Sequence, residues 1–194
     1  MDDKKAQIFS VAKKLFSEKG FKDTNVAEIT REAGVAVGTF YLYYSSKEKL
    51  FFDVFMEENL KLKQLCLDSL DYSASPQTII EQMLRINMEG FATNPILRQW
   101  YQSNVYQKLE QVFRKENAMD SMTFLYDVFL VLVERWQAEG KMRRDIDSKM
   151  IMMLFAAIIN VDTHKDEIGL EFFPELLQIM TSLVLQGLTE HCPD

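Results

Sequence analysis

Apolar residues recur three and four positions apart along almost the whole chain, which is the spacing of one face of an α-helix. The first such run contains Ile8, Val11, Ala12, Leu15 and Phe16. No segment shows the sustained alternation of apolar and polar residues that a half-buried strand requires. With 194 residues, 47% of them hydrophobic, the chain can bury a substantial core. The pattern predicts an all-α fold of about nine helices.

Helix-starting and helix-ending residues divide this pattern into segments. Gly20 and Gly140 are suited to end helices, since glycine adopts the left-handed conformation of a C-terminal cap without strain. Residues suited to begin helices are Asp23 to Asn25, Ser45 with Glu48, Ser75 before Pro76, Asn94 before Pro95, and Asp147. We expect a small head of residues 1–45, and a larger helical body of residues 46–194 that begins with a long helix.

The segment from Val26 to Tyr44 has the features of a helix-turn-helix. Gly34 can supply the positive φ of the turn between two short helices. The apolar residues spaced to meet across the corner are Ile29, Ala33, Val35 and Phe40. The residues expected on the free face of the second helix are Val37, Thr39, Tyr41 and Tyr43. These conditions alone leave open whether the segment binds DNA.

The first fifty residues resemble the N-terminal signature of the TetR (tetracycline-repressor) family of transcriptional regulators. The matching positions are Ile8, Ala12, residues 15–16, 19–21, Thr24, Ile29, residues 33–35, 38–44 and 46–50. The rest of the chain resembles the family only in length, in helical content and in the motif at residues 140–146. The resemblance implies a helix-turn-helix head and a C-terminal body for ligand binding and dimerisation.

The resemblance assigns the DNA contacts by position. Thr24 and Asn25 are expected to contact phosphate at the start of the second helix, Gly38 to permit close approach, and Thr39 and Tyr41 to contact base or sugar edges. Tyr43 and Lys47 are expected to hold the DNA backbone. Packing within the head is the alternative for the two tyrosines. The full predicted DNA-binding set is Thr24, Asn25, Ala36, Val37, Gly38, Thr39, Tyr41, Tyr43 and Lys47.

This sequence departs from the family pattern at Thr30, Ala36, Phe40 and Tyr44. The family usually has a hydroxyl-bearing residue where Ala36 stands, and Val37 offers only an apolar contact, such as one to a thymine methyl group. The departures keep open a second interpretation, in which a helical small-molecule-binding protein carries a head that does not recognise DNA.

A dimer is expected because two recognition helices must reach successive major grooves, roughly 34–36 Å apart. The family pairs its last two helices with those of a second subunit, and this sequence has an apolar stripe on each of the two. The predicted interface residues are Ile151, Leu154, Phe155, Ile158, Leu176, Met180, Leu183 and Val184. Burial of these stripes within one subunit is the alternative.

The middle helices are rich in aromatic residues and methionine, which are typical of sites for small apolar molecules. The predicted ligand-binding residues are Met83, Asn87, Phe91, Trp100, Tyr101, Asn104, Met122, Tyr126 and Phe129. Ordinary core packing is the alternative for each aromatic. The family resemblance implies that such a ligand swings the long helix after the head and releases operator DNA.

The charge distribution and the absence of metal-binding and phosphate-binding motifs restrict the classes of function that the sequence supports. Residues 1–50 carry a net charge of +2 and residues 51–194 one of −9, so DNA can approach the head more easily than the body. Neither a metal-ligand spacing nor a phosphate-binding glycine loop is present, which predicts no enzyme, no metal and no cofactor. A catalytic cluster around His164 or Asp127 is the competing hypothesis. Cys66 and Cys192 lie far apart, and neither a signal peptide nor a membrane span is apparent, which favours the cytoplasm.

Overall fold

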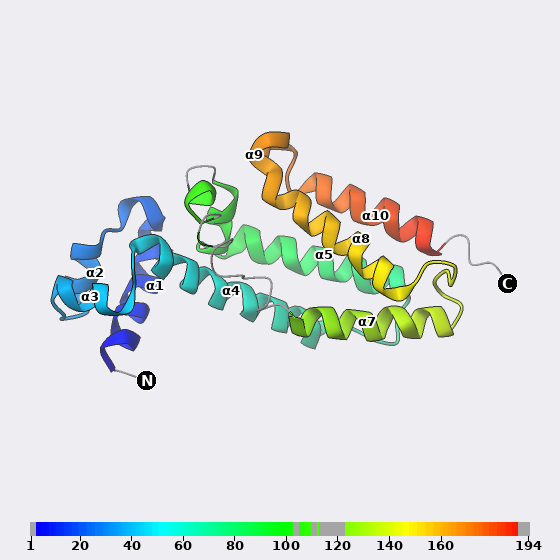
Figure 1. Cartoon of the computed structure of the whole chain (residues 1–194), viewed down its shortest axis with the longest axis horizontal. Helices are drawn as coiled ribbons and strands as arrows, with labels where there is room; N and C mark the ends of the chain where they lie inside the picture. Colours follow the sequence, from blue (N-terminus) through cyan, green and yellow to red (C-terminus); the bar gives the residue numbers. More distant parts are fainter. Residues whose placement is uncertain (1–2, 103–104, 110–111, 113–122, 190–194) are drawn as a thin grey trace. The chain divides into compact units, whose positions relative to one another are not determined.

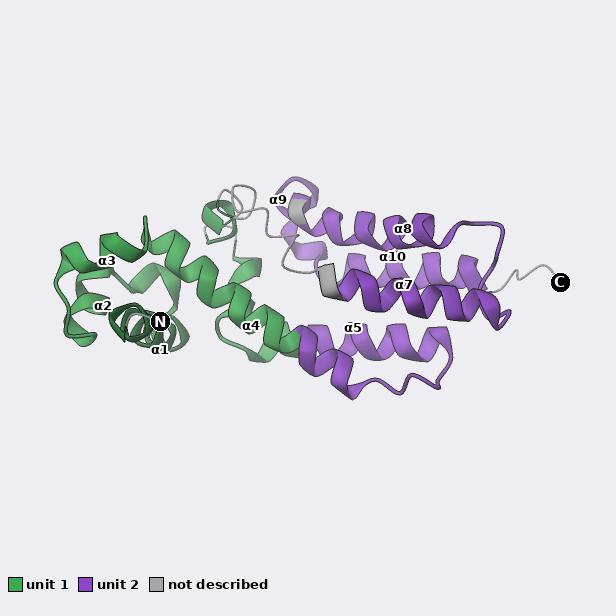
Figure 2. Cartoon of the chain, turned by 60° about the horizontal axis from the view of Figure 1, so that its bottom comes forward, with its two compact units in different colours: residues 1–62, 89–118 green, residues 63–88, 119–194 purple. Residues whose placement is uncertain are grey.

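The computed structural model describes residues 3–102, 105–109, 112 and 123–189, and in these ranges it is helical without strands. The all-α prediction is therefore confirmed (Figure 1). The chain forms two compact units, which Figure 2 distinguishes by colour. Unit 1 comprises residues 1–62 and 89–118, and unit 2 comprises residues 63–88 and 119–194. The helices in the described ranges include none with both the length and the apolar character to cross a membrane.

Unit 1 begins with three helices that pack on one another: α1 (Asp3–Asp23), α2 (Val26–Glu32) and α3 (Val37–Tyr43). Gly20 interrupts α1 with a φ of 82°, as its position in the pattern suggested. Asn25 caps α2, and its side-chain oxygen accepts a hydrogen bond from the Glu28 amide at 2.9 Å. The core beneath these helices contains Ile8, Phe16 and Phe40, each fully buried.

The long helix α4 (Lys47–Ser69) follows the head, and α5 (Pro76–Thr93) follows α4. Ser46, rather than the predicted Ser45, provides the side-chain cap of α4, because its Oγ accepts from the Lys49 amide at 3.1 Å. Ser75 caps α5 as predicted, accepting from the Thr78 amide at 3.1 Å. The predicted start at Asn94 is also present, but it opens only the short 3-10 helix η1 (Leu97–Tyr101).

Unit 2 contains α7 (Thr123–Ala138), α8 (Ser148–Val161) and α10 (Glu175–Thr189). Helix α8 packs against both α7 and α10. Short turns η3 (Asp162–His164), α9 (Lys165–Ile168) and η4 (Leu170–Phe172) connect α8 to α10. Asp147 caps α8 as predicted, accepting from the Lys149 amide at 2.9 Å. Trp136 and Ile151 are fully buried at the centre of the core of this unit.

The compact units differ from the predicted division at residue 45. The first turns of α4 belong with the head, because Leu50, Phe51 and Val54 are fully buried there. Phe51 packs edge-on against Phe16 and Phe21, with ring centroids 4.9 and 5.1 Å away. Periodicity identifies α4 as one helix, but it does not indicate where along that helix the packing partners change.

Candidate nucleic-acid interface

The turn between α2 and α3 is built around Gly34, whose φ of 65° lies in the left-handed region that favours glycine. The Val35 amide donates to the carbonyl of Thr30 at 3.0 Å, which closes the turn. Thr30 is buried, and its hydroxyl donates to Val26 O within α2. The departure from the family at Thr30 is thus accommodated inside the helix and leaves the turn intact.

The two faces of α3 differ sharply in exposure. Phe40 is fully buried, and its ring packs against those of Tyr41 and Tyr44 at 5.2 and 5.8 Å. Val37, Tyr41 and Leu42 are 48%, 56% and 79% exposed. A short helix that buries one aromatic residue and leaves three large apolar side chains in solvent presents a surface suited to a partner.

Ala36 and Gly38 are both exposed at the start of α3. Ala36 occupies the N-cap position without a side-chain hydrogen bond, so no polar group of its side chain satisfies the first amides. A Cβ atom added at Gly38 would meet nothing within 4 Å. Packing inside the protein therefore does not require glycine there, and close approach of an external molecule remains the predicted reason.

The end of α1 is held by two side chains from elsewhere in unit 1. The Lys47 ammonium donates to the carbonyls of Phe21 and Thr24, both at 2.7 Å, and lies 4.2 Å from the centre of the Phe21 ring. Gln99 Oε1 accepts from the Phe21 amide at 2.6 Å. Burial lowers the pKa of Lys47. The sequence prediction missed both roles, because neither residue has a local signal that shows which distant carbonyl or amide it reaches.

The predicted DNA-contact residues are thus in different environments. The head places Val37, Thr39 and Tyr41 on α3, and Asn25 is exposed at the start of α2. Thr24 is 1% exposed, and its hydroxyl donates to Gly20 O at 2.8 Å. Thr24 and Lys47 therefore serve the internal structure of the head, whatever further contact they make.

An ion-pair network also connects α1 and α4 in unit 1. Lys13 Nζ lies 2.8 Å from Glu57 Oε1 and 2.5 Å from Glu58 Oε1. Partial burial opposes the charge on Lys13, but the two carboxylates outweigh that effect and raise its pKa. Asn94 Nδ2 donates to Glu58 Oε2 at 2.7 Å, which joins the chain after α5 to the same network. The network ties the first turns of α4 to α1.

The residues predicted for the dimer interface divide between the core and the surface of unit 2. Ile151 and Ile158 are 0% and 5% exposed, so they have almost no surface to offer a second subunit. Leu154 and Leu183 are exposed. The other predicted residues, all partly buried, are Phe155, Leu176, Met180 and Val184. The outward face also carries exposed apolar residues outside the predicted set, which are Met150, Met153, Ile159 and Ile179.

The residues predicted for ligand binding fall into the two units. Phe91, Trp100 and Tyr101 belong to an aromatic cluster of unit 1. Met83, Tyr126 and Phe129 pack against the core of unit 2, where Asn87 also accepts a hydrogen bond from Lys63. Asn104 and Met122 lie outside the described residues.

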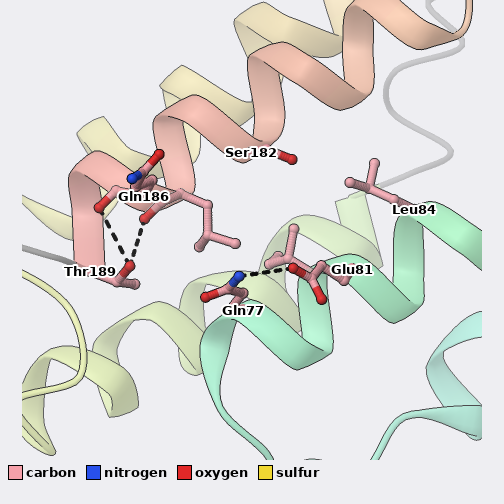
Figure 3. Close-up of a pocket in the computed structure, with 8 residues that line it drawn as sticks. Gln77, Glu81, Leu84, Ser182, Gln186 and Thr189 are labelled. Carbon is pink, nitrogen blue, oxygen red and sulfur yellow. Dashed lines mark hydrogen bonds between the residues drawn. The ribbon is translucent and has the colours of Figure 1, made fainter.

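Unit 2 also has a pocket of about 270 Å³ between α5 and α10 (Figure 3). Its lining residues are Gln77, Ile80, Glu81, Leu84, Ser182, Leu185, Gln186 and Thr189. Gln77 Nε2 donates to the Glu81 carboxylate at 2.9 Å, and the Thr189 hydroxyl donates to the carbonyl of Leu185 at 3.0 Å. Its rim is polar, and its lining includes none of the predicted ligand-binding residues.

The polar residues considered for a catalytic cluster are exposed. His164 Nδ1 lies 3.2 Å from a Glu167 carboxylate oxygen three residues along the chain, and Asp127 is exposed on α7. Within the ranges that the structure describes, no three His, Cys, Asp or Glu side chains are grouped so that they could hold a metal ion.

An all-helical chain whose N-terminal helix-turn-helix leaves its second helix exposed has the architecture of a DNA-binding regulator. Residues 8–54 match the family model of bacterial regulatory proteins of the tetR family. The HTH-type transcriptional regulator YerO of Bacillus subtilis (strain 168) is 27% identical over 180 residues, which cover 85% of this chain and 61% of YerO. The N-terminal region of the chain is therefore similar to the tetR family of bacterial regulatory proteins, and the similarity to YerO extends over most of the chain.

Solved structures show the same fold over nearly the whole chain. A tetR-family transcription regulator from Shewanella sp. PV-4 is 22% identical, with a TM-score of 0.55 and coverage of 96% of this chain and 98% of that one. RolR in complex with the ligand resorcinol is 18% identical, with a TM-score of 0.60 and coverage of 96% and 88%. The chain spans less than two thirds of the length of YerO.

Proposed function

We propose that the chain is a homodimeric transcriptional repressor that binds operator DNA through α3 and is released from it by a small apolar or amphipathic molecule. The observation that carries the proposal is the exposed face of α3, with Val37, Tyr41 and Leu42 in solvent beside the fully buried Phe40. A helix held by one buried aromatic residue can enter a major groove without disturbing the core of the head.

Dimerisation is supported by the exposed apolar face of unit 2. Met150 and Leu154 lie four residues apart on α8, so they share one side of that helix. Ile179 and Leu183 have the same relation on α10, which packs against α8. Exposed apolar side chains on neighbouring helices are typical of protein interfaces. The proposed interface is therefore this outward face of α8 and α10.

A small-molecule effector is supported by the family and by the aromatic residues of the body. The related RolR structure contains resorcinol, so the shared fold accommodates a small molecule in that protein. To release DNA, the effector must bind the released conformation more tightly than the DNA-bound one. A shift from mostly bound to mostly free requires a difference of several kcal/mol, ~5.5 kcal/mol for a change from 1:99 to 99:1.

DNA binding is tested by fluorescence anisotropy with a labelled fragment from upstream of the gene, at several salt concentrations. We expect specific binding that weakens as salt rises, because phosphate contacts release counterions. Tyr41→Ala should weaken the specific complex about tenfold, since it removes a large exposed side chain of α3. Leu65→Ala, at a residue of similar exposure on α4, should leave the affinity unchanged.

The competing interpretation makes the opposite prediction. If the head does not recognise DNA, neither the upstream fragment nor other genomic fragments will bind at low salt, and both variants will behave alike. A folded variant is verified by its circular dichroism spectrum, so that loss of binding by Tyr41→Ala is assigned to the contact surface.

A further inference from the structure

Unit 1 contains an aromatic cluster that the helix-turn-helix does not use. The rings of Phe55 and Trp100 stack with centroids 5.1 Å apart and planes 19° from parallel. Phe91 lies 6.4 Å from Phe55 and 5.8 Å from Tyr101, and Trp100 meets Tyr106 edge-on at 5.0 Å. Phe55, Trp100 and Tyr106 are at most 7% exposed. These rings are contributed by α4, α5 and the segment around η1.

Asn59 places a polar group on the same face of α4. It is 5% exposed, and its Oδ1 atom accepts no hydrogen bond in the described structure. It follows Phe55 by four residues and precedes Leu62 by three, so all three side chains lie on one side of the helix. Leu62 packs so closely against Gly90 that a Cβ atom there would overlap its side chain. The segment at Gly90 and Phe91 therefore lies opposite this face of α4.

An unpaired carbonyl oxygen in such a setting is unfavourable. A buried polar group loses its hydrogen bonds to water, and the fold recovers that loss only if it supplies a donor. Most buried acceptors in folded proteins have such a donor, so each exception requires an explanation. Within the described residues, Asn59 Oδ1 is therefore a buried acceptor without a donor, on the side of α4 that carries Phe55.

The charges nearest in sequence are engaged elsewhere. Glu58 Oε1 pairs with Lys13, and Glu58 Oε2 accepts from Asn94. Glu57 also pairs with Lys13 and with Lys61. A third charged residue, Lys63, follows Asn59 by four residues on the same side of α4, and its ammonium is engaged by Asn87 Oδ1. This composition favours a neutral ligand over an anion or a cation.

We propose that Phe55, Phe91, Trp100 and Asn59 form the binding site for a neutral, planar aromatic molecule that carries one O–H or N–H donor. The ring of this molecule packs against the aromatic side chains, and its donor hydrogen-bonds to Asn59 Oδ1. The inference deepens the proposed function, on which the assignment of this molecule as the effector rests. It adds Asn59, which was not among the predicted ligand-binding residues, and it assigns the orienting contact to that residue.

The test uses the full chain and two probes that share the naphthalene ring, one with an O–H donor and the other with a methyl ether in its place. Isothermal titration calorimetry compares 2-naphthol with 2-methoxynaphthalene, whose ether oxygen cannot donate. We expect the wild type to bind 2-naphthol about tenfold more tightly, the difference expected for one buried hydrogen bond. Asn59→Leu should remove this preference by weakening only 2-naphthol. Gln64→Leu, at an exposed amide on the same helix, should retain the preference.

A second measurement uses the free protein. Asn59→Leu replaces the unpaired amide by an apolar side chain of similar size, so the thermal midpoint of the free chain should rise. Equal affinity of the wild type for the two probes, a preserved preference in Asn59→Leu, or no binding of either probe would overturn the inference. A lowered midpoint would also overturn it, since it would show that Asn59 is already satisfied by the fold.

The outcomes separate this inference from the proposed function. Failure of both probes to bind, with specific binding to the upstream DNA fragment intact, removes the aromatic site and leaves the DNA-binding proposal standing. Binding of 2-naphthol through Asn59 without any release of DNA confirms the site and contradicts its role as an effector site.

Discussion

Lys47 provides the sharpest test of how the head is held together. The family resemblance assigns this residue to the DNA backbone, whereas its ammonium donates to the carbonyls of Phe21 and Thr24 at 2.7 Å. Lys47→Met keeps most of the aliphatic chain and removes the charge and both hydrogen bonds. The change therefore isolates the contribution of the ammonium group to the end of α1.

The expected loss is worked out from these contacts. A hydrogen bond to a charged group contributes ~1.5–3 kcal/mol, but Lys47 is only partly buried, so water replaces part of both bonds. Burial also lowers the pKa of Lys47, so the variant recovers some desolvation free energy. We expect a net loss of about 2 kcal/mol, and for a chain of this size a fall of about 4–8 °C in the thermal midpoint.

Differential scanning calorimetry measures the midpoint, and DNA titrations at several salt concentrations measure the phosphate contacts. Lys61→Met is the matched control, because Lys61 lies on the same helix and pairs with Glu57 and Glu58 at the surface. Lys61→Met should lower the free energy of unfolding by less than about 1 kcal/mol, because exposed ion pairs contribute no more than that. If Lys47 acts as a cap, the slope of log affinity against log salt stays unchanged. An unchanged midpoint together with a slope smaller by ~0.9 would refute the cap and assign Lys47 to a phosphate.

Two further perturbations test unit 2. Lys63 has its pKa lowered from 10.5 to about 8, mainly by burial, so the unfolded chain binds more protons between these values. The free energy of unfolding should therefore rise with pH from about 8 to 10.5 more steeply in the wild type than in Lys63→Met, and parallel profiles by chemical denaturation would contradict the shift. Leu183→Glu places a charge on the proposed interface and should yield monomers by analytical ultracentrifugation, whereas Val131→Glu, at a similarly exposed residue of α7, should not. If the Leu183→Glu variant forms a dimer of unchanged stability, this face of α8 and α10 is not the dimer interface.

Local signals predicted much of the fold. Asn25, Ser75 and Asp147 each accept the expected helix-start amide, since capping depends only on residues two or three positions away. The turn at Gly34 and the burial of Phe40 follow from equally short-range rules. The shift of the α4 cap from Ser45 to Ser46 is a choice between adjacent hydroxyls that the sequence pattern does not distinguish.

The details that the sequence pattern does not indicate depend on contacts distant in sequence. Both faces of α8 are apolar, so periodicity does not indicate that Ile151 and Ile158 enter the core while Met150 and Leu154 remain outside. The aromatic residues of the middle helices look alike in the sequence, yet Trp100 belongs to unit 1 and Phe129 to unit 2. The buried Asn59 gives no local signal, because its neighbours on α4 follow an ordinary helical pattern.

The composition of α3 constrains where the affinity for DNA arises. This helix contains no acidic or basic residue, so its exposed side chains can read base edges but cannot release counterions from phosphates. Lys13 is paired with Glu57 and Glu58, and Lys47 is turned to the end of α1. We therefore expect exposed lysines of α1 to supply much of the salt-dependent part of DNA binding, and these include Lys4, Lys14 and Lys22. We therefore expect specificity and electrostatic attraction to reside on different helices of the head, so substitutions in α3 should change sequence preference while leaving the salt dependence intact.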